Sequence, residues 1–95
     1  MTELIKHEKI TDELGNTVEI KMWKIPQSGK RNQQTFKYSL VYIVNGKRVI
    51  GYDNAERKGD HRHYGNKEEP YEFISLKKLA EDFNSDIETY RKGKL

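Results

Sequence analysis

The chain has 95 residues, of which 35% are charged and only 34% are hydrophobic. This length suits one domain with a single core, and the low apolar share predicts that the core is thin. The sequence contains no cysteine, which excludes a disulfide framework and a thiolate metal site. A formal net charge of +3 permits an anionic partner without requiring one.

No stretch of the sequence has the apolar length of a signal peptide or of a membrane span. We therefore expect a cytoplasmic protein that does not bind a membrane. The sequence also lacks a Gly-rich phosphate loop, a nucleophile elbow and internal repeats, which excludes the common nucleotide-binding and serine-hydrolase signatures.

The first part of the chain predicts two strands joined by a turn. Leu4–Ile10 carries apolar residues among charged ones, and Thr11–Asn16 has the composition of a turn. Thr17–Ile25 alternates apolar and charged residues, which predicts a second strand that Pro26 ends. The alternation changes near Trp23, which indicates either a bulge or a strand covered on both faces.

The middle of the chain predicts a loop and then a hairpin. Gln27–Gln34 is polar throughout and indicates an exposed loop; its two adjacent cations leave a phosphate-contacting arm as the alternative. Thr35–Val44 has the clearest alternation in the sequence and predicts a strand. Asn45-Gly46 follows at once and is the preferred pair for a type I′ turn, so Lys47–Asp53 is the predicted antiparallel partner.

The C-terminal part predicts one amphipathic helix. Ser75–Lys92 begins with a good N-cap residue, and Gly93 stops it. Before it, Glu68-Glu69-Pro70 indicates a solvated turn that leads into a short final strand at Tyr71–Ile74. The apolar face of the helix repeats every three and four residues and comprises Leu76, Leu79, Ala80, Phe83, Ile87 and Tyr90.

This order of elements predicts an α+β fold for a single domain spanning residues 1–95. We expect an antiparallel meander of about four to five strands with the C-terminal helix packed across one face. A helix over one sheet face is also the simplest way for so short a chain to form a core.

The residues with the most reactive side chains gather in Tyr52–Tyr64. Two of the three histidines, His61 and His63, stand on either side of Arg62. If this segment is extended, both imidazoles point to one face of the strand and Arg62 points to the other. Imidazoles titrate near neutral pH, so the pair can act as an acid and a base, and Asp60 can orient one of them.

A metal site is the rival interpretation of these histidines. His61 and His63 with a carboxylate, Asp53 or Asp60, would supply three ligands and leave a position open. The neighbouring arginines disfavour this interpretation because they repel a divalent cation, and we expect neither a metal nor another cofactor. The remaining alternative is a pair of exposed or structurally hydrogen-bonded histidines without a chemical role.

The same stretch carries groups that nucleic acids need. Arg57, Lys58 and Arg62 can meet a phosphate, and Tyr52 and Tyr64 can stack on unpaired bases. For other residues we expect structural roles: packing for Tyr71, loop-shaping hydrogen bonds for Asp53-Asn54, and a strand surface for His7.

The sequence YDNAERKGDHRHYGNKEEPYEFISLKKLAEDF, from Tyr52 to Phe83, resembles the TumE-like proteins, the toxin half of bacterial and archaeal toxin–antitoxin pairs. The chain departs from the family pattern at Arg57, where a glycine is often found, and its first fifty residues match only in style. The resemblance rests on Tyr52-Asp53-Asn54, Gly59-Asp60-His61-Arg62-His63, Pro70-Tyr71-Glu72-Phe73 and a late Asp82-Phe83 in the helix.

The resemblance implies an intracellular, growth-inhibiting toxin that is neutralised by a cognate antitoxin, which often contains a helix-turn-helix. By analogy with other small basic toxins, we expect a metal-independent ribonuclease that acts on single-stranded RNA through the His61–His63 pair. The alternative is a non-catalytic module that inhibits by binding RNA or protein. A third alternative is a chain whose open hairpin edge and helix serve assembly, and a homodimer is compatible with this.

Overall fold

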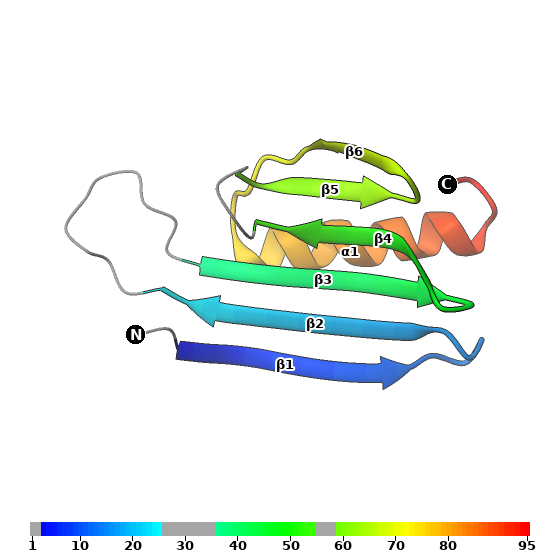
Figure 1. The fold of residues 1–95 in the computed structure, drawn as a ribbon, viewed down its shortest axis with the longest axis horizontal. Coiled ribbons are helices and arrows are strands. Elements are labelled where there is room, and N and C mark those ends of the chain that lie inside the picture. Colours follow the sequence, from blue (N-terminus) through cyan, green and yellow to red (C-terminus); the bar gives the residue numbers. More distant parts are fainter. Residues whose placement is uncertain (1–2, 26–35, 55–58) are drawn as a thin grey trace.

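The computed structural model describes residues 3–25, 36–54 and 59–95. These ranges form one six-stranded sheet in the order β1-β2-β3-β4-β5-β6, with antiparallel neighbours throughout, and one helix (Figure 1). The predicted α+β meander with a C-terminal helix is thus confirmed, but it has six strands instead of four to five. The elements are β1 (Glu3–Thr11), β2 (Thr17–Lys24), β3 (Phe36–Val44), β4 (Lys47–Asp53), β5 (His61–Tyr64), β6 (Lys67–Pro70) and α1 (Leu76–Arg91).

The extra strand comes from the hairpin of β5 and β6. The predicted turn at Glu68-Glu69-Pro70 is wrong, because these residues lie in β6 and pair with β5. The predicted final strand at Tyr71–Ile74 is also wrong, since residues 71–75 have no regular structure. β6 reads Lys-Glu-Glu-Pro and has no apolar alternation, so its backbone pairing left no pattern in the sequence.

The first hairpin contains a bulge opposite Trp23. Leu4 pairs with Trp23 and Lys6 pairs with Met22, so Ile5 is the additional residue. The irregularity lies where the sequence indicated it, although the extra residue belongs to β1 and not to β2. Pro26 and the predicted loop Gln27–Gln34 lie outside the described residues.

The central hairpin is as the sequence predicted. β3 and β4 pair antiparallel around Asn45-Gly46, whose φ angles of 53° and 76° are both positive, as a type I′ turn requires. The pairing shifts by one residue after Tyr42, which places a bulge in β4. This bulge decides which face of the sheet the first residues of β4 occupy.

The helix begins and ends close to the predicted residues. The hydroxyl of Ser75 accepts a hydrogen bond from the Lys78 backbone N–H at 3.1 Å, and Gly93 follows the helix with a φ of 73°. One helix face is buried against the sheet, as predicted. The buried core consists of Met22, Tyr38, Leu40, Tyr42, Ile50, Tyr52, Leu79, Phe83 and Ile87.

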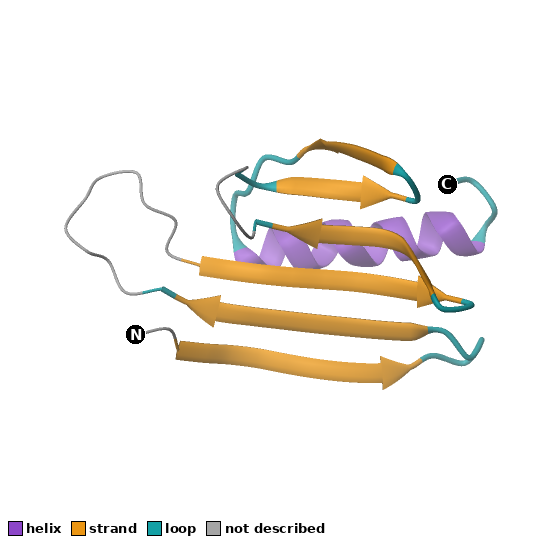
Figure 2. Ribbon diagram, in the orientation of Figure 1, coloured by secondary structure: helices purple, strands orange, loops and turns teal. Residues whose placement is uncertain are grey.

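The helix covers one face of part of the sheet. Figures 1 and 2 show α1 behind β3, β4 and β5, with β1 and β2 extending beyond it. Every residue of β1 is exposed. Within the described ranges, no helix or strand lies over the opposite face of the sheet, which we call the open face. No helix in these ranges is long and apolar enough to cross a membrane.

Candidate functional site

The pairing of β4 with β5 brings three polar side chains together. Asp53 lies opposite His61, and Gly51 lies opposite His63. Directly opposed residues share a sheet face, so Asp53, His61 and His63 all lie on the open face. Arg62 pairs with Tyr52 and therefore points to the helix side. This confirms that the two histidines share one face and that Arg62 occupies the other.

Both imidazoles turn toward one carboxylate. Nε2 of His61 lies 2.8 Å from Oδ1 of Asp53, and Nε2 of His63 lies 3.4 Å from Oδ2 of the same residue. The two rings meet edge to face with their centroids 4.9 Å apart. We call Asp53, His61 and His63 the histidine–aspartate cluster. Asp53 is held between two bases that can each carry a proton.

His63 is the more buried partner, with 8% of its surface exposed. Its Nε2 is buried and makes no hydrogen bond within the part of the chain that the structure describes. Burial lowers the pKa of His63, the positive charge of Arg48 lowers it further, and the charges of Asp53 and Glu68 oppose the shift. Burial and Arg48 thus favour the neutral form of His63, the form that can accept a proton.

The contacts of His61 differ from those of His63. Nδ1 of His61 lies 3.0 Å from the carbonyl oxygen of Gly59, which can only accept, so Nδ1 carries a proton. The other nitrogen faces the Asp53 carboxylate, which also accepts when it is ionised. Both ring nitrogens of His61 therefore have an acceptor as their neighbour.

The cluster also has the composition of a metal site. One ligand atom from each of Asp53, His61 and His63 can be chosen so that all lie within 4.8 Å of one another. Two imidazoles and a carboxylate are common ligands for divalent transition metals, and a backbone carbonyl on the second nitrogen of His61 is typical of ligating histidines. These three residues can therefore hold a cation as well as exchange protons.

Of the three predicted phosphate-binding residues, the structure describes Arg62, which lies away from the cluster. Arg57 and Lys58 lie outside the described residues. Arg62, on the helix side, donates from Nε to Glu69 at 2.6 Å and stacks over the Tyr64 ring at 5.2 Å. Asp60, predicted to orient an imidazole, accepts a hydrogen bond from the Tyr38 hydroxyl at 2.6 Å.

The tyrosines of the stretch join the sheet to the helix. Tyr52 is fully buried, so its ring offers no face to an unpaired base. The hydroxyls of Tyr52 and Tyr64 both donate to Asp86 of α1, the latter at 2.9 Å. Tyr71 packs against the core, as predicted, and donates to Asp82 at 2.6 Å. The two tyrosines predicted to stack on bases thus stabilise the fold from the helix side.

The sequence offers Asp53 beside the histidines only as a possible metal ligand, and it gives no sign of Arg48. Asp53 was expected to shape the loop, as Asn54 does through hydrogen bonds to the backbone of Tyr38 and Phe36 at 2.9 and 2.8 Å. Asp53 instead lies between the histidines. Arg48 is the cation whose charge acts on His63. Only the pairing of β4 with its neighbours reveals either position.

The model of the TumE toxin family matches residues 2–91, almost the whole chain. The chain belongs to the TumE toxin family. The match extends well beyond Tyr52–Phe83, the stretch that carries the resemblance, and includes the first two strands. Membership of this toxin family implies a cognate antitoxin. No curated protein and no solved structure matches the chain.

Proposed function

We propose that this member of the TumE family is a metal-independent ribonuclease that cleaves single-stranded RNA with His61 and His63 as an acid–base pair. The main support is that both imidazoles turn Nε2 toward Asp53 on one open sheet face, at 2.8 and 3.4 Å. Cleavage by the neighbouring 2′-hydroxyl needs one group to take that proton and another to protonate the leaving oxygen. Two adjacent imidazoles supply both groups.

In this mechanism His63 is the base and His61 is the acid. His63 has the lowered pKa, which favours the neutral form that a base needs, so it takes the proton of the 2′-hydroxyl. The 2′-oxygen then bonds to phosphorus, the bond from phosphorus to the 5′-oxygen breaks, and His61 gives its proton to that 5′-oxygen. The products are a 2′,3′-cyclic phosphate and a free 5′-hydroxyl.

We assign the orienting role to Asp53 instead of Asp60. Asp53 faces Nε2 of both histidines, at 2.8 Å from His61 and 3.4 Å from His63. This carboxylate can therefore fix the relative orientation of the two rings. Single-stranded RNA fits the proposal because its backbone can bend into line for attack by the 2′-oxygen, whereas a duplex holds it rigid.

The first test compares variants of the purified protein on single-stranded RNA. His61→Ala and His63→Ala are each expected to lower the cleavage rate by about 10²–10⁴-fold. The double variant is expected to lose little more than either single one, because the residues act as a unit. The matched control is His7→Ala, which removes an exposed histidine of β1 that pairs with Glu19 and is expected to keep full activity.

The second test separates the acid–base pair from a metal. Activity is expected to survive EDTA and to show a bell-shaped pH profile, with limbs on either side of about 6.5. Activity that is lost in EDTA and restored by a divalent cation would instead assign Asp53, His61 and His63 as metal ligands. Folded, toxic protein that leaves RNA intact would favour the binding-module alternative.

A further inference from the structure

Arg48 occupies the open face because of the bulge in β4. Tyr42 pairs with Ile50, but the next residue, Ile43, pairs with Arg48, so Val49 is the additional residue. In a regular strand Arg48 would share a face with Ile50 and point toward the helix. The extra residue turns it to the face that carries the histidine–aspartate cluster, as bulges commonly do.

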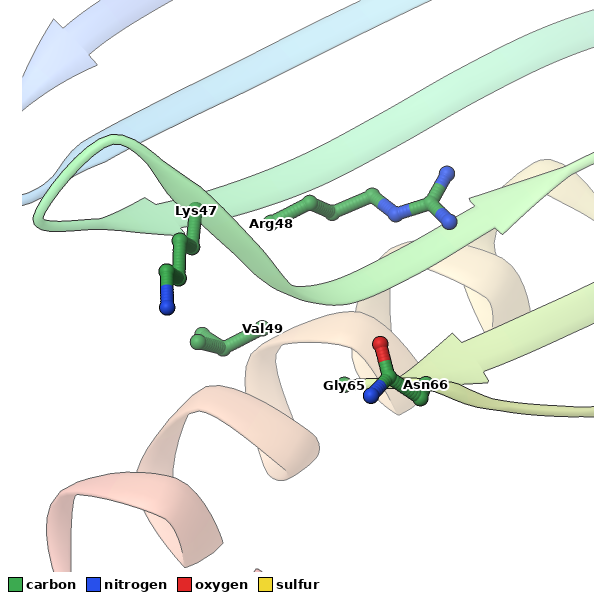
Figure 3. Close-up of a pocket in the computed structure, with 5 residues that line it drawn as sticks. All are labelled: Lys47, Arg48, Val49, Gly65 and Asn66. Carbon is green, nitrogen blue, oxygen red and sulfur yellow. The ribbon is translucent and has the colours of Figure 1, made fainter.

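Gly51 leaves room for the side chain of Arg48 to run along β4 toward His63. A β-carbon on Gly51 would stand 2.9 Å from Cδ of Arg48 and 3.4 Å from its Nε. It would stand 3.6 Å from Cδ2 of His63, at an ordinary van der Waals distance. Any other residue at position 51 would therefore compete with the arginine for this space, which gives the glycine a reason to be in the strand. Figure 3 shows the Arg48 side chain running along β4 from its start.

The guanidinium of Arg48 is available to an anion. Among residues 3–25, 36–54 and 59–95, Arg62 pairs with Glu69 and Arg91 pairs with Asp12 and Glu13, whereas Arg48 pairs with no carboxylate. The residue is exposed. A hollow adjoins it, lined by Lys47, Arg48, Val49, Gly65 and Asn66 (Figure 3).

We propose that Arg48 binds the phosphodiester that the histidine–aspartate cluster cleaves; this inference rests on the proposed ribonuclease function. A guanidinium presents a planar fork of donors that matches two phosphate oxygens. The negative charge of Asp53 repels a phosphate, so an anion beside the two histidines needs a cation on the other side of His63. Arg48 supplies that charge, and it also meets the charge that develops on the phosphate during cleavage.

The experiment measures binding without cleavage. The probe is a single-stranded RNA oligonucleotide with a 2′-O-methyl group at every position, which blocks attack by the 2′-oxygen. Arg48→Gln is expected to weaken binding about tenfold or more, and to lower the slope of log affinity against log salt by about one. Arg48→Lys keeps the positive charge but loses the planar fork of donors. Its affinity for the probe is therefore expected to lie between those of the wild type and Arg48→Gln.

Two further variants control for charge and for position. Lys67→Gln removes an exposed cation of β6, which pairs with Tyr64 on the helix side, and is expected to leave binding unchanged. Gly51→Ala keeps Arg48 but displaces it, so it should weaken binding nearly as much as Arg48→Gln does. In the Arg48→Gln background, Gly51→Ala should change the affinity for the probe little, because both substitutions remove the same contact. Thermal unfolding of each variant verifies that it is folded.

The outcomes test the role of Arg48 and the ribonuclease proposal separately. Unchanged binding by folded Arg48→Gln, or no measurable binding by the wild-type protein, would overturn the role of Arg48. The role of Arg48 would also be overturned if Gly51→Ala weakened binding equally in the wild type and in the Arg48→Gln background, because the glycine would then act independently of the arginine. If the wild type binds the probe through Arg48 but does not cleave unmodified RNA, the ribonuclease proposal fails and the phosphate site stands.

Discussion

At the scale of single residues, Asp53 is the carboxylate that both histidines contact. It is the one described carboxylate that contacts Nε2 of His61 and of His63. Asp53→Asn keeps the shape of the side chain and removes its charge, so both rings lose the carboxylate that they face. We expect the variant to fold and to cleave RNA about 10²-fold more slowly. The matched control is Glu81→Gln, an exposed carboxylate of α1, and equal rates for both variants would contradict the role of Asp53.

Burial of His63 predicts a dependence of stability on pH. Its pKa in the folded protein is lowered, so the unfolded chain binds a proton at a higher pH than the folded chain does. The folded state keeps its full stability above the unfolded value of about 6.5 and loses part of it as the pH falls from there to the lowered folded value. We expect wild-type protein to lose more free energy of unfolding than His63→Gln between pH 7.5 and 5, measured by urea unfolding. Parallel pH slopes would show that the shift is absent.

The sequence predicts the histidine pair, offers Asp53 or Asp60 beside it only as a metal ligand, and does not predict Arg48. His61 and His63 stand two residues apart, and a strand alone places them on one face. Asp53 meets them only through the pairing of β4 with β5. Arg48 reaches them only through an extra residue in β4, which reverses the face that simple alternation predicts. Neither the pairing register nor the bulge has a signature in a single sequence.

At the scale of elements, apolar patterning decides what the sequence can predict. β3, β4 and α1 were predicted within about a residue because alternation, an Asn-Gly turn and a capped amphipathic face each mark them. β6 was missed because four polar or proline residues pair through their backbone with little apolar burial. The bounds of β5 were not predicted, and its extended shape was a condition of the argument about the two histidines.

The contact of α1 with the sheet is the main source of the core. Phe83 is fully buried and packs edge to face on Tyr52, with ring centroids 6.1 Å apart. Phe83→Ala is expected to lower the free energy of unfolding by about 3–5 kcal/mol, which threatens a domain with so thin a core. Urea unfolding of this variant and of Glu81→Ala, an exposed residue of the same helix, measures the effect. Similar midpoints for the two variants would mean that the helix does not hold the sheet.

At the scale of the whole molecule, the two sheet faces have separate tasks. The helix side carries the core, the tyrosine hydroxyls and the Arg62–Glu69 pair. The open face carries the histidine–aspartate cluster and Arg48. This separation lets substitutions at the cluster change activity without removing the packing that holds the sheet to α1.

The same separation predicts where the cognate antitoxin binds. We propose that it covers the open face over β4 and β5, because a partner that blocks the cluster there neutralises the toxin without unfolding it. Hydrogen exchange of the toxin, alone and with its antitoxin, is expected to slow most in peptides from Tyr52–Tyr64. The exposed edge strand β1 provides the internal comparison. Protection confined to β1 would show that the antitoxin binds at the sheet edge and acts on the cluster from a distance.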